Sequence, residues 1–350
     1  MSARIAICAA QVPFTRGGAE VLYETLQGEL ERRGHRAEIV ALPFNWSSRQ
    51  AILRSALAWR MVELGDAAGE RVDLVIATRF PSYVVRHPRK VVWLIHQFRQ
   101  IYDLAGTKFS DFGTRPGDDE VASMIRSIDQ RALGEARARF SISANTAERL
   151  RRFNQLDAEP LHPPPAHGDR YRSGPHGDTV VTVGRLDPMK RFDLLVRALA
   201  ACRRPVRAVI AGEGPDRERL AALAVELGVA ERVELPGRID DERLLALYER
   251  ALAVFYAPFD EDYGYVTVEA LRSERPVVTT ADAGGVLEFV EDGVDGFVCA
   301  AGGAAPREIA ARFDRLFDDR DEAARLGRVG RERVAAIGWD RVVERLLATI

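Results

Sequence analysis

Two cations, Arg185 and Lys190, stand five positions apart where an apolar, β-branched run gives way to a helix. Asp187 and Pro188 turn the chain between them. An arginine offers a planar fork of donors and a lysine a mobile point charge, so the pair suits a ligand with two adjacent phosphates. Two solvated cations would be the simpler interpretation, but the positive end of a helix disfavours cations unless something negative binds there. The spacing therefore predicts a diphosphate site.

Two carboxylates, Glu261 and Glu269, flank a second predicted helix start. Glu261 follows an apolar run, Gly264 allows a tight turn, and Glu269 falls on the second helical turn. Free backbone amides are expected near Tyr263 and Tyr265. Carboxylates accept hydrogen bonds from hydroxyl groups, so this pattern favours a polyhydroxylated ligand that carries phosphate. A plain helix cap is the alternative role for Glu261.

Two glycine pairs also follow predicted strands and open helices. Gly17 and Gly18 come after the first strand, and Gly284 and Gly285 come after a late one. Glycine removes the side chain that would keep a phosphate away from backbone amides at a helix start. An ordinary strand-to-helix turn explains either pair alone, so the hypothesis depends on all four loops together.

The elements that must position these residues alternate regularly along the chain. Short β-branched runs are separated by longer segments with helical spacing, which indicates parallel sheets covered on both faces. The predicted fold class is therefore α/β, with two doubly wound, Rossmann-like domains facing a central cleft and ligands at the carboxyl ends of the strands. The expected strands lie at 4–10, 36–43, 72–79, 90–97, 139–145, 179–185, 206–214, 232–238, 253–259, 276–285 and 296–300.

A proline- and glycine-rich stretch divides the chain. Helix and central strand are both unfavourable there, so residues 163–178 are predicted to be a linker. The expected domains are residues 1–162, joined by a C-terminal crossover helix at about 337–350, and residues 179–336.

Composition excludes several classes of protein. The 350 residues carry a net charge of −2 without a clustered basic stripe, so no nucleic-acid partner is expected. No window resembles a membrane span or a signal peptide, which predicts a cytoplasmic protein. The three cysteines are far apart in apolar runs and suggest neither disulfides nor a zinc site.

Taken in order, the motifs resemble a known family. "GRLDPMK" resembles an R-x4-K diphosphate clamp, "EDYGYVTVE" an E-x7-E motif, and "GGVLEFVEDGVDGFV" a donor-side loop. The match is to nucleotide-sugar-dependent, retaining glycosyltransferases of the GT-B fold, in the group-one family (glycosyltransferase family four). It covers nearly the whole chain.

The resemblance implies roles for the phosphate and ribose ligands. Arg185 and Lys190 would hold the donor diphosphate, and the loop with Gly17 and Gly18 would close on it. Glu269 would bind the ribose hydroxyls.

It also implies roles around the sugar. Glu261, with the amides at Tyr263 and Gly264, would hold the transferred sugar, and the base would stack near Arg238-Ile239. His96, at the end of a first-domain strand, would lie close to that sugar. The family's usual "EGFG" is "EDYG" here, which could alter the sugar accepted.

The expected activity is transfer of a hexose, of the mannose or glucose type, from a GDP-, UDP- or ADP-sugar to a glycan or lipid-linked glycan in polysaccharide or glycoconjugate synthesis. The clamp cations would make a metal unnecessary, so no cofactor is expected. A GT-B epimerase, a phosphorylase and a non-catalytic two-lobed sugar-binding protein are the alternatives.

Two stretches of the first half bear on the acceptor. Residues Asn45–Gly65 have an apolar helical stripe, which would pack on the sheet or lie on lipid at the inner face of a membrane, as a peripheral contact. Residues Tyr102–Glu120 have no periodicity and are expected to form a mobile lid over the sugar.

Overall fold

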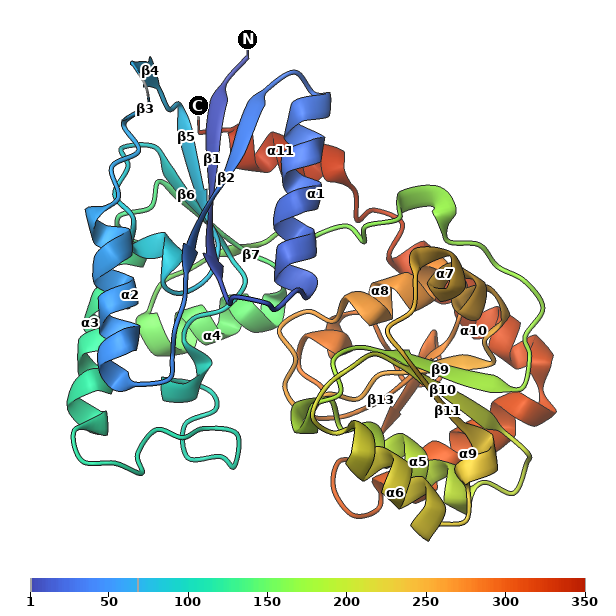
Figure 1. Ribbon diagram of the computed structural model, residues 1–350. Coiled ribbons are helices and arrows are strands. Elements are labelled where there is room, and N and C mark those ends of the chain that lie inside the picture. The colour runs from blue at the N-terminus through green and yellow to red at the C-terminus, as the bar shows by residue number, and fades with distance from the viewer. Residues whose placement is uncertain (1, 68, 350) are drawn as a thin grey trace. The chain divides into compact units, whose positions relative to one another are not determined.

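The computed structural model describes residues 2–67 and 69–349 (Figure 1). The chain divides into two compact units. Unit 1 comprises the described residues up to Ala166 together with those from Ile337 on, and unit 2 comprises His167–Ala336. Each unit contains one six-stranded parallel sheet; the sequence predicts parallel sheets in both, with one strand fewer in unit 1.

Unit 1 is built on a sheet with the strand order β2-β1-β5-β6-β7-β8. In Figure 1, α1 and α11 lie on one face of this sheet and α2 and α3 on the other. Its strands are β1 (Arg4–Gln11), β2 (Arg36–Pro43), β5 (Leu74–Ala77), β6 (Lys90–Leu94), β7 (Ala138–Ser141) and β8 (Glu159–Pro160), with a separate hairpin of β3 (Asp66–Ala67) and β4 (Glu70–Arg71). Its helices are α1 (Gly18–Arg32), α2 (Arg49–Met61), α3 (Asp118–Gly134), α4 (Ala144–Asn154) and α11 (Trp339–Leu347), with 3-10 turns at Ser82–Val84 and Arg99–Ile101.

Unit 2 has the strand order β11-β10-β9-β12-β13-β14. Helices α5, α6 and α9 cover one face of this sheet, and α7, α8 and α10 cover the other (Figure 1). Its strands are β9 (Thr179–Val183), β10 (Arg207–Ala211), β11 (Val233–Gly237), β12 (Ala253–Phe255), β13 (Val277–Thr280) and β14 (Gly296–Cys299). Its helices are α5 (Phe192–Ala201), α6 (Arg217–Glu226), α7 (Asp241–Arg250), α8 (Tyr265–Arg272), α9 (Ala305–Asp318) and α10 (Arg320–Arg333), with 3-10 turns at Gly168–Arg170, Pro188–Lys190, Ala230–Arg232 and Gly285–Glu288.

Every strand expected from the sequence is present, although several are shorter than expected. The clearest difference is at 139–145, where β7 ends at Ser141 and α4 begins at Ala144. The side chain of Ser143 accepts a hydrogen bond from the Thr146 amide and caps this helix. The cap favours a helix start at the point where the sequence pattern predicted that the strand would continue.

The proline- and glycine-rich stretch is packed onto unit 2 from His167 on. Tyr171 is buried, and the amides of Gly174 and Gly177 donate to the carbonyls of Glu249 and Arg250. Arg275, which is fully buried, donates to the Gly174 carbonyl at 2.8 Å. The second half of the expected linker is therefore fixed to the unit that follows it.

The amphipathic stripe of α2 packs inward. Ile52, Ala56 and Trp59 are at most 1% exposed and belong to the unit 1 core, whereas Leu57 and Met61 are exposed. Of the two interpretations kept for this stripe, packing on the sheet accounts for its buried residues. None of the helices among the described residues is long and apolar enough to cross a membrane.

The expected lid is held by several contacts inside unit 1. Arg49 on α2 donates to both carboxylate oxygens of Asp118, and also to Asp111. Asp118 accepts three further hydrogen bonds from the amides of residues 113–115. Phe112 is buried against Arg49, whose guanidinium carbon lies 3.7 Å from the ring centroid. This half of the stretch is ordered by its own ion pairs.

Candidate functional site

The strand order of unit 2 reverses between β9 and β12, the strands that bear the two predicted motifs. In doubly wound sheets, ligands bind outside the carboxyl ends of the strands at such a reversal. Arg185 and Lys190 follow β9, and Glu261 follows β12. Spacing along the chain and position in the sheet therefore agree on one location.

Backbone hydrogen bonds join the loops at this edge into a continuous rim. The Leu186 amide donates to the Glu213 carbonyl at 2.9 Å, and the Phe259 amide to the Met189 carbonyl at 2.8 Å. Glycines permit the contact, because a Cβ on Gly212 would lie 1.8 Å from the Gly184 carbonyl oxygen. A Cβ on Gly214 would lie 2.2 Å from the Leu186 oxygen.

Lys190 and Glu261 contact each other directly. Lys190 Nζ lies 2.5 Å from Glu261 Oε2, and the side chains are only 22% and 18% exposed. The buried Tyr256 hydroxyl lies 3.0 Å from Lys190 Nζ and 3.1 Å from Glu261 Oε2. Burial by itself would lower the pKa of Lys190, but the Glu261 carboxylate and Tyr256 raise it above its usual value. Lys190 therefore stays charged.

Arg185 differs from Lys190 in its surroundings. Its side chain is exposed, and no ion pair to it is found among the described residues. One clamp cation is thus open to solvent, and the other is paired within the protein.

Arg191 connects the loop after β12, which carries Glu261, to the loop after β13, which carries Asp282. Its guanidinium donates to both oxygens of Asp282 at 2.7 and 2.8 Å, and to the carbonyls of Ala257 and Pro258. The cations at this helix start were expected to need an external anion, but Glu261 pairs with Lys190 and Asp282 pairs with Arg191 within the chain. Only the structure assigns Arg191 this positioning role, since the sequence shows it merely as a third cation.

Gly284 and Gly285 approach the protein's own backbone. A Cβ on Gly284 would lie 2.6 Å from the Glu261 amide nitrogen, and one on Gly285 would lie 2.5 Å from the Asp262 carbonyl oxygen. The Gly285 amide donates to the Glu261 carbonyl at 2.8 Å. These glycines therefore allow close packing that holds the Glu261 loop in place. The sequence predicted that they would allow close approach of a phosphate.

The start of α8 has the predicted form. Gly264 precedes the helix with a φ of 87°, which favours glycine. The ring of Tyr263 is 2% exposed and packs against Tyr265 and Phe289, with centroids 5.2 and 5.4 Å away. The Tyr263 side chain therefore belongs to the packing beneath the loop, and only its backbone could meet a ligand.

Glu269 lies on the second turn of α8, as expected, and is partly buried. The Tyr248 hydroxyl donates to its Oε2 at 2.9 Å. The hydroxyl of the buried Tyr171 lies near the same carboxyl group, outside hydrogen-bonding geometry. Burial raises the pKa of Glu269 to about 7, against the lowering effect of the two tyrosines. Nothing in the sequence pattern singles out these two tyrosines, one in the connecting stretch and the other on α7.

The two residues predicted to lie near the nucleotide base are one loop further along the rim. Arg238 and Ile239 follow β11, and the Gly237 carbonyl accepts a hydrogen bond from the Gly212 amide at 2.8 Å. Arg238 is exposed and Ile239 is half-buried. The rim thus places a cation and an apolar side chain beside the loop that follows β10.

In unit 1, the predicted glycine loop is closed by a carboxylate of the chain. The Gly17 amide donates to Glu20 Oε2 at 2.8 Å, and Gly18 begins α1. Arg79 donates to Glu20 Oε1 at 2.9 Å, and both side chains are at most 14% exposed. The amide expected to meet a phosphate is therefore occupied by Glu20.

His96 follows β6 in unit 1 and is partly exposed. Its Nδ1 lies 2.6 Å from the Gln97 carbonyl oxygen. Gln97, in the position where aspartate is frequent in the family, is buried and donates to Asn154 at 2.5 Å. His96 and the Gly17 loop thus belong to unit 1, and the other predicted residues belong to unit 2.

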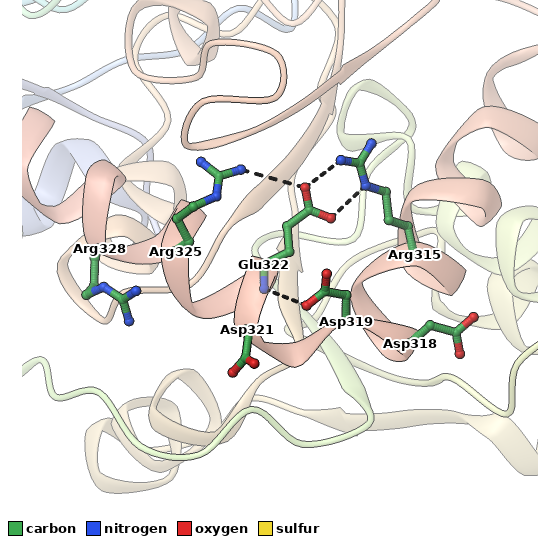
Figure 2. Close-up of a pocket in the computed structure, with 7 residues that line it drawn as sticks. All are labelled: Arg315, Asp318, Asp319, Asp321, Glu322, Arg325 and Arg328. Atoms are coloured by element: carbon green, nitrogen blue, oxygen red, sulfur yellow. Dashed lines mark hydrogen bonds and ion pairs between the residues drawn. The ribbon is translucent and has the colours of Figure 1, made fainter.

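A charged hollow of about 720 Å³ lies elsewhere in unit 2, where α9 meets α10 (Figure 2). A helix that follows a parallel strand runs back toward the amino ends of the sheet, so the end of α9 lies away from the rim. The charges pair with one another, since Glu322 bonds Arg315 and contacts Arg325. We assign this hollow no ligand. Within the described part of the chain, no cluster of three or more His, Cys, Asp or Glu side chains suits a metal ion.

Known proteins are similar to this chain over the segment that forms the rim of unit 2. Residues 170–333 match the family model "Glycosyl transferases group 1". The D-inositol 3-phosphate glycosyltransferase of Nocardia farcinica is 34% identical over 231 residues, which cover 58% of this chain and 51% of that protein. The GDP-mannose-dependent alpha-(1-6)-phosphatidylinositol monomannoside mannosyltransferase of Mycobacterium tuberculosis is 35% identical over 228 residues, covering 60% and 58%.

Solved structures match over the full length. Sucrose-phosphate synthase from Thermosynechococcus elongatus has a TM-score of 0.78 at 18% identity, covering 99% of this chain and 100% of that one. Anabaena HepE in complex with UDP-glucose has a TM-score of 0.73 at 18% identity, covering 99% and 98%. These likenesses show the GT-B fold.

The chain spans about half the length of the curated relatives it matches. The family model covers the segment that carries Arg185, Lys190, Glu261 and Glu269. Residues 170–333 are therefore similar to the group 1 glycosyl transferases.

Proposed function

We propose that the protein is a retaining glycosyltransferase that moves a hexose from a nucleoside-diphosphate sugar to a glycan or lipid-linked glycan. The observation that carries this proposal is the arrangement at the strand-order reversal of unit 2. There, one rim carries two cations for a diphosphate, and two carboxylates for hydroxyl groups come from the loop after β12 (Glu261) and from α8 (Glu269).

Each group has a distinct task in the proposed reaction. When the nucleoside diphosphate leaves, negative charge builds on its β-phosphate. Arg185 and Lys190 stabilise that charge, and cations fixed in advance favour the transition state more than the ground state. Glu269 accepts hydrogen bonds from the ribose, and Glu261 accepts them from the sugar.

Retention of the anomeric configuration is proposed because the motifs resemble those of retaining glycosyltransferases. The acceptor hydroxyl would attack on the face from which the diphosphate departs. This step needs no metal ion in the proposal, because the two cations neutralise the leaving group.

The donor is proposed as a mannose- or glucose-type sugar on GDP, UDP or ADP. GDP-mannose serves the mycobacterial relative, and the Anabaena structure holds UDP-glucose. The acceptor is proposed to meet unit 1, where His96 is partly exposed. Leu57 and Met61 on α2 are exposed apolar side chains, and we propose them as a peripheral contact for a lipid-linked acceptor.

A panel of sugar nucleotides tests the proposal. The protein is incubated with GDP-mannose, UDP-glucose, ADP-glucose and related donors, with and without oligosaccharide acceptors, and release of nucleoside diphosphate is followed. Acceptor-dependent release with one donor is the expected result. No release with any donor, together with no nucleotide binding, would contradict the proposal.

The alternatives give different results in the same experiment. An epimerase would change the sugar without transferring it, and a binding protein would leave the donor intact. A phosphorylase with pyridoxal phosphate would show the absorbance band of that cofactor in the pure protein. The anomeric configuration of the product, measured by NMR, decides between retention and inversion.

A further inference from the structure

The two groups proposed to hold different parts of the donor bind each other in the structure. Lys190 is assigned to the diphosphate and Glu261 to the sugar, yet Nζ and Oε2 form an ion pair at 2.5 Å. Each side chain is about one-fifth exposed, so the pair is shielded from solvent but reachable. A phosphate that binds Lys190 therefore competes with Glu261 for the charge and the N–H donors of the ammonium group.

The carboxylate cannot move far from Lys190. The Glu261 amide donates to the Ala283 carbonyl at 3.1 Å, and the Glu261 carbonyl accepts from the Gly285 amide at 2.8 Å. The glycines at 284 and 285 allow this close packing, because a Cβ at either would overlap the Glu261 loop. The backbone of Glu261 is therefore fixed, and its carboxylate stays near any phosphate that Lys190 binds.

Tyr256 keeps the pair aligned. Its hydroxyl lies within hydrogen-bond distance of both groups, and its side chain is 4% exposed. A hydroxyl can donate to the carboxylate after the lysine has turned to a phosphate, so Glu261 keeps one partner in either state. The flexible lysine stem makes that turn easy.

We propose that Glu261 is an internal competitor for the diphosphate site. It holds Lys190 in the empty protein, accepts the sugar hydroxyls when a sugar nucleotide binds, and returns to Lys190 after transfer. This inference rests on the proposed function and deepens it. The protein then binds the intact donor in preference to the nucleoside diphosphate that remains after transfer.

The physical reason is the balance of partners around the carboxylate. When the intact donor binds, the Glu261 carboxylate gives up its contact with the Lys190 ammonium group and accepts hydrogen bonds from the sugar hydroxyls instead. With the bare nucleoside diphosphate, it loses the ammonium group, gains no hydroxyl and faces a phosphate of like charge. Release of the product is therefore assisted by the same carboxylate that holds the sugar.

Binding of GDP and UDP to three proteins tests the inference by calorimetry. In Glu261→Gln, the competing charge is gone, and we expect the preferred diphosphate to bind about tenfold more tightly, as expected for one charge-assisted hydrogen bond. Glu218→Gln is the matched control, because Glu218 is an exposed carboxylate on α6 and its side chain has no contact with Lys190 in the described residues. It should change the affinity by at most about twofold.

The intact donor provides the opposite comparison. Its affinity should stay the same or fall in Glu261→Gln, so that the preference for sugar nucleotide over diphosphate shrinks. In Glu261→Ala, the preference for sugar nucleotide over diphosphate should shrink as well. Thermal melting checks that both variants fold.

The outcomes separate the inference from the proposed function. If the wild type binds and uses a donor while both Glu261 variants bind diphosphate no more tightly, the inference is wrong and the proposed function stands. If neither the wild type nor the variants bind any nucleotide, both fail. Diphosphate binding that appears only in the variants supports the inference directly.

Discussion

Each unit surrounds one buried or partly buried carboxyl group with two tyrosines, but the two arrangements differ in how they are completed. In unit 1, Asp129 on α3 is fully buried and accepts hydrogen bonds from Tyr83 at 2.9 Å and Tyr102 at 2.8 Å. In unit 2, Glu269 is partly exposed and bonded by Tyr248, and the Tyr171 hydroxyl has no partner among the described residues. Burial raises the pKa of both carboxyl groups to about 7.

The difference teaches that a shifted pKa does not by itself mark a ligand site. Burial produces the same shift in both places. What distinguishes Glu269 is accessible surface together with incomplete hydrogen bonding, which leaves capacity for a ligand. Asp129 has neither, so it is assigned to the stability of unit 1.

The strand-order reversals of the two sheets show a related contrast. In unit 1 the reversal lies between β1 and β5, and the Glu20–Arg79 pair occupies it. In unit 2 the Lys190–Glu261 pair occupies the corresponding place, but the neighbouring Arg185 is exposed. Only the second reversal presents an unpaired cation to solvent among the described residues.

The largest expected effect is on turnover and comes from the cations of unit 2. Arg185→Ala or Lys190→Ala should lower turnover by about 10²- to 10³-fold, because each removes a group that stabilises the leaving diphosphate. Arg197→Ala, on the exposed side of α5, is the matched control and should leave turnover unchanged. Initial rates of diphosphate release measure the effect, and near-normal rates in both clamp variants would refute the assignment.

A smaller effect separates the two carboxyl groups. Asp129→Ala leaves two buried hydroxyl groups unpaired and should lower the free energy of unfolding by about 2–4 kcal/mol, without changing nucleotide affinity. Glu269→Ala should weaken nucleotide binding by about 1.5–3 kcal/mol, the scale of hydrogen bonds to a charged group. Chemical denaturation and calorimetry on both variants measure the two quantities. If both substitutions altered the same quantity, the contrast between the sites would be wrong.

The smallest effect is on the pH dependence of stability. The native pKa of Asp129 is raised from 3.8 to about 7, so the folded protein binds more protons than the unfolded chain between these values. The free energy of unfolding should therefore fall as pH rises through this window, by up to about 1.4 kcal/mol per pH unit from this group. Asp129→Asn should remove that slope. Denaturation at several pH values compares the two proteins, and parallel curves would argue against a protonated Asp129.

Much of the fold could be predicted because it depends on local pattern. Runs such as Val72–Arg79 and Lys90–Gln97 are apolar and β-branched, and buried parallel strands need that composition. The clamp cations and carboxylates could be placed at the sheet edge because they directly follow such runs. Their expected roles remain predictions.

Side-chain pairing could not be predicted in the same way. Glu20 meets Arg79, Lys190 meets Glu261, and Arg191 meets Asp282 across loops that are close only in the folded units. Spacing along the chain does not predict contacts between side chains that are close only after folding. Tyr171 was assigned to a linker because proline and glycine surround it, although burial of its ring fixes that stretch to unit 2.

The glycine contacts along the rim also limit how base preference can diverge among related sequences. Positions 212 and 214 have no space for a side chain, because a Cβ at either would overlap the backbone of a neighbouring loop. The side chains of Glu213, Arg238 and Ile239 extend from the same rim and are at least partly exposed. Under the proposed function, a change of nucleotide base preference is therefore expected at these three positions, while the backbone that supports them stays unchanged.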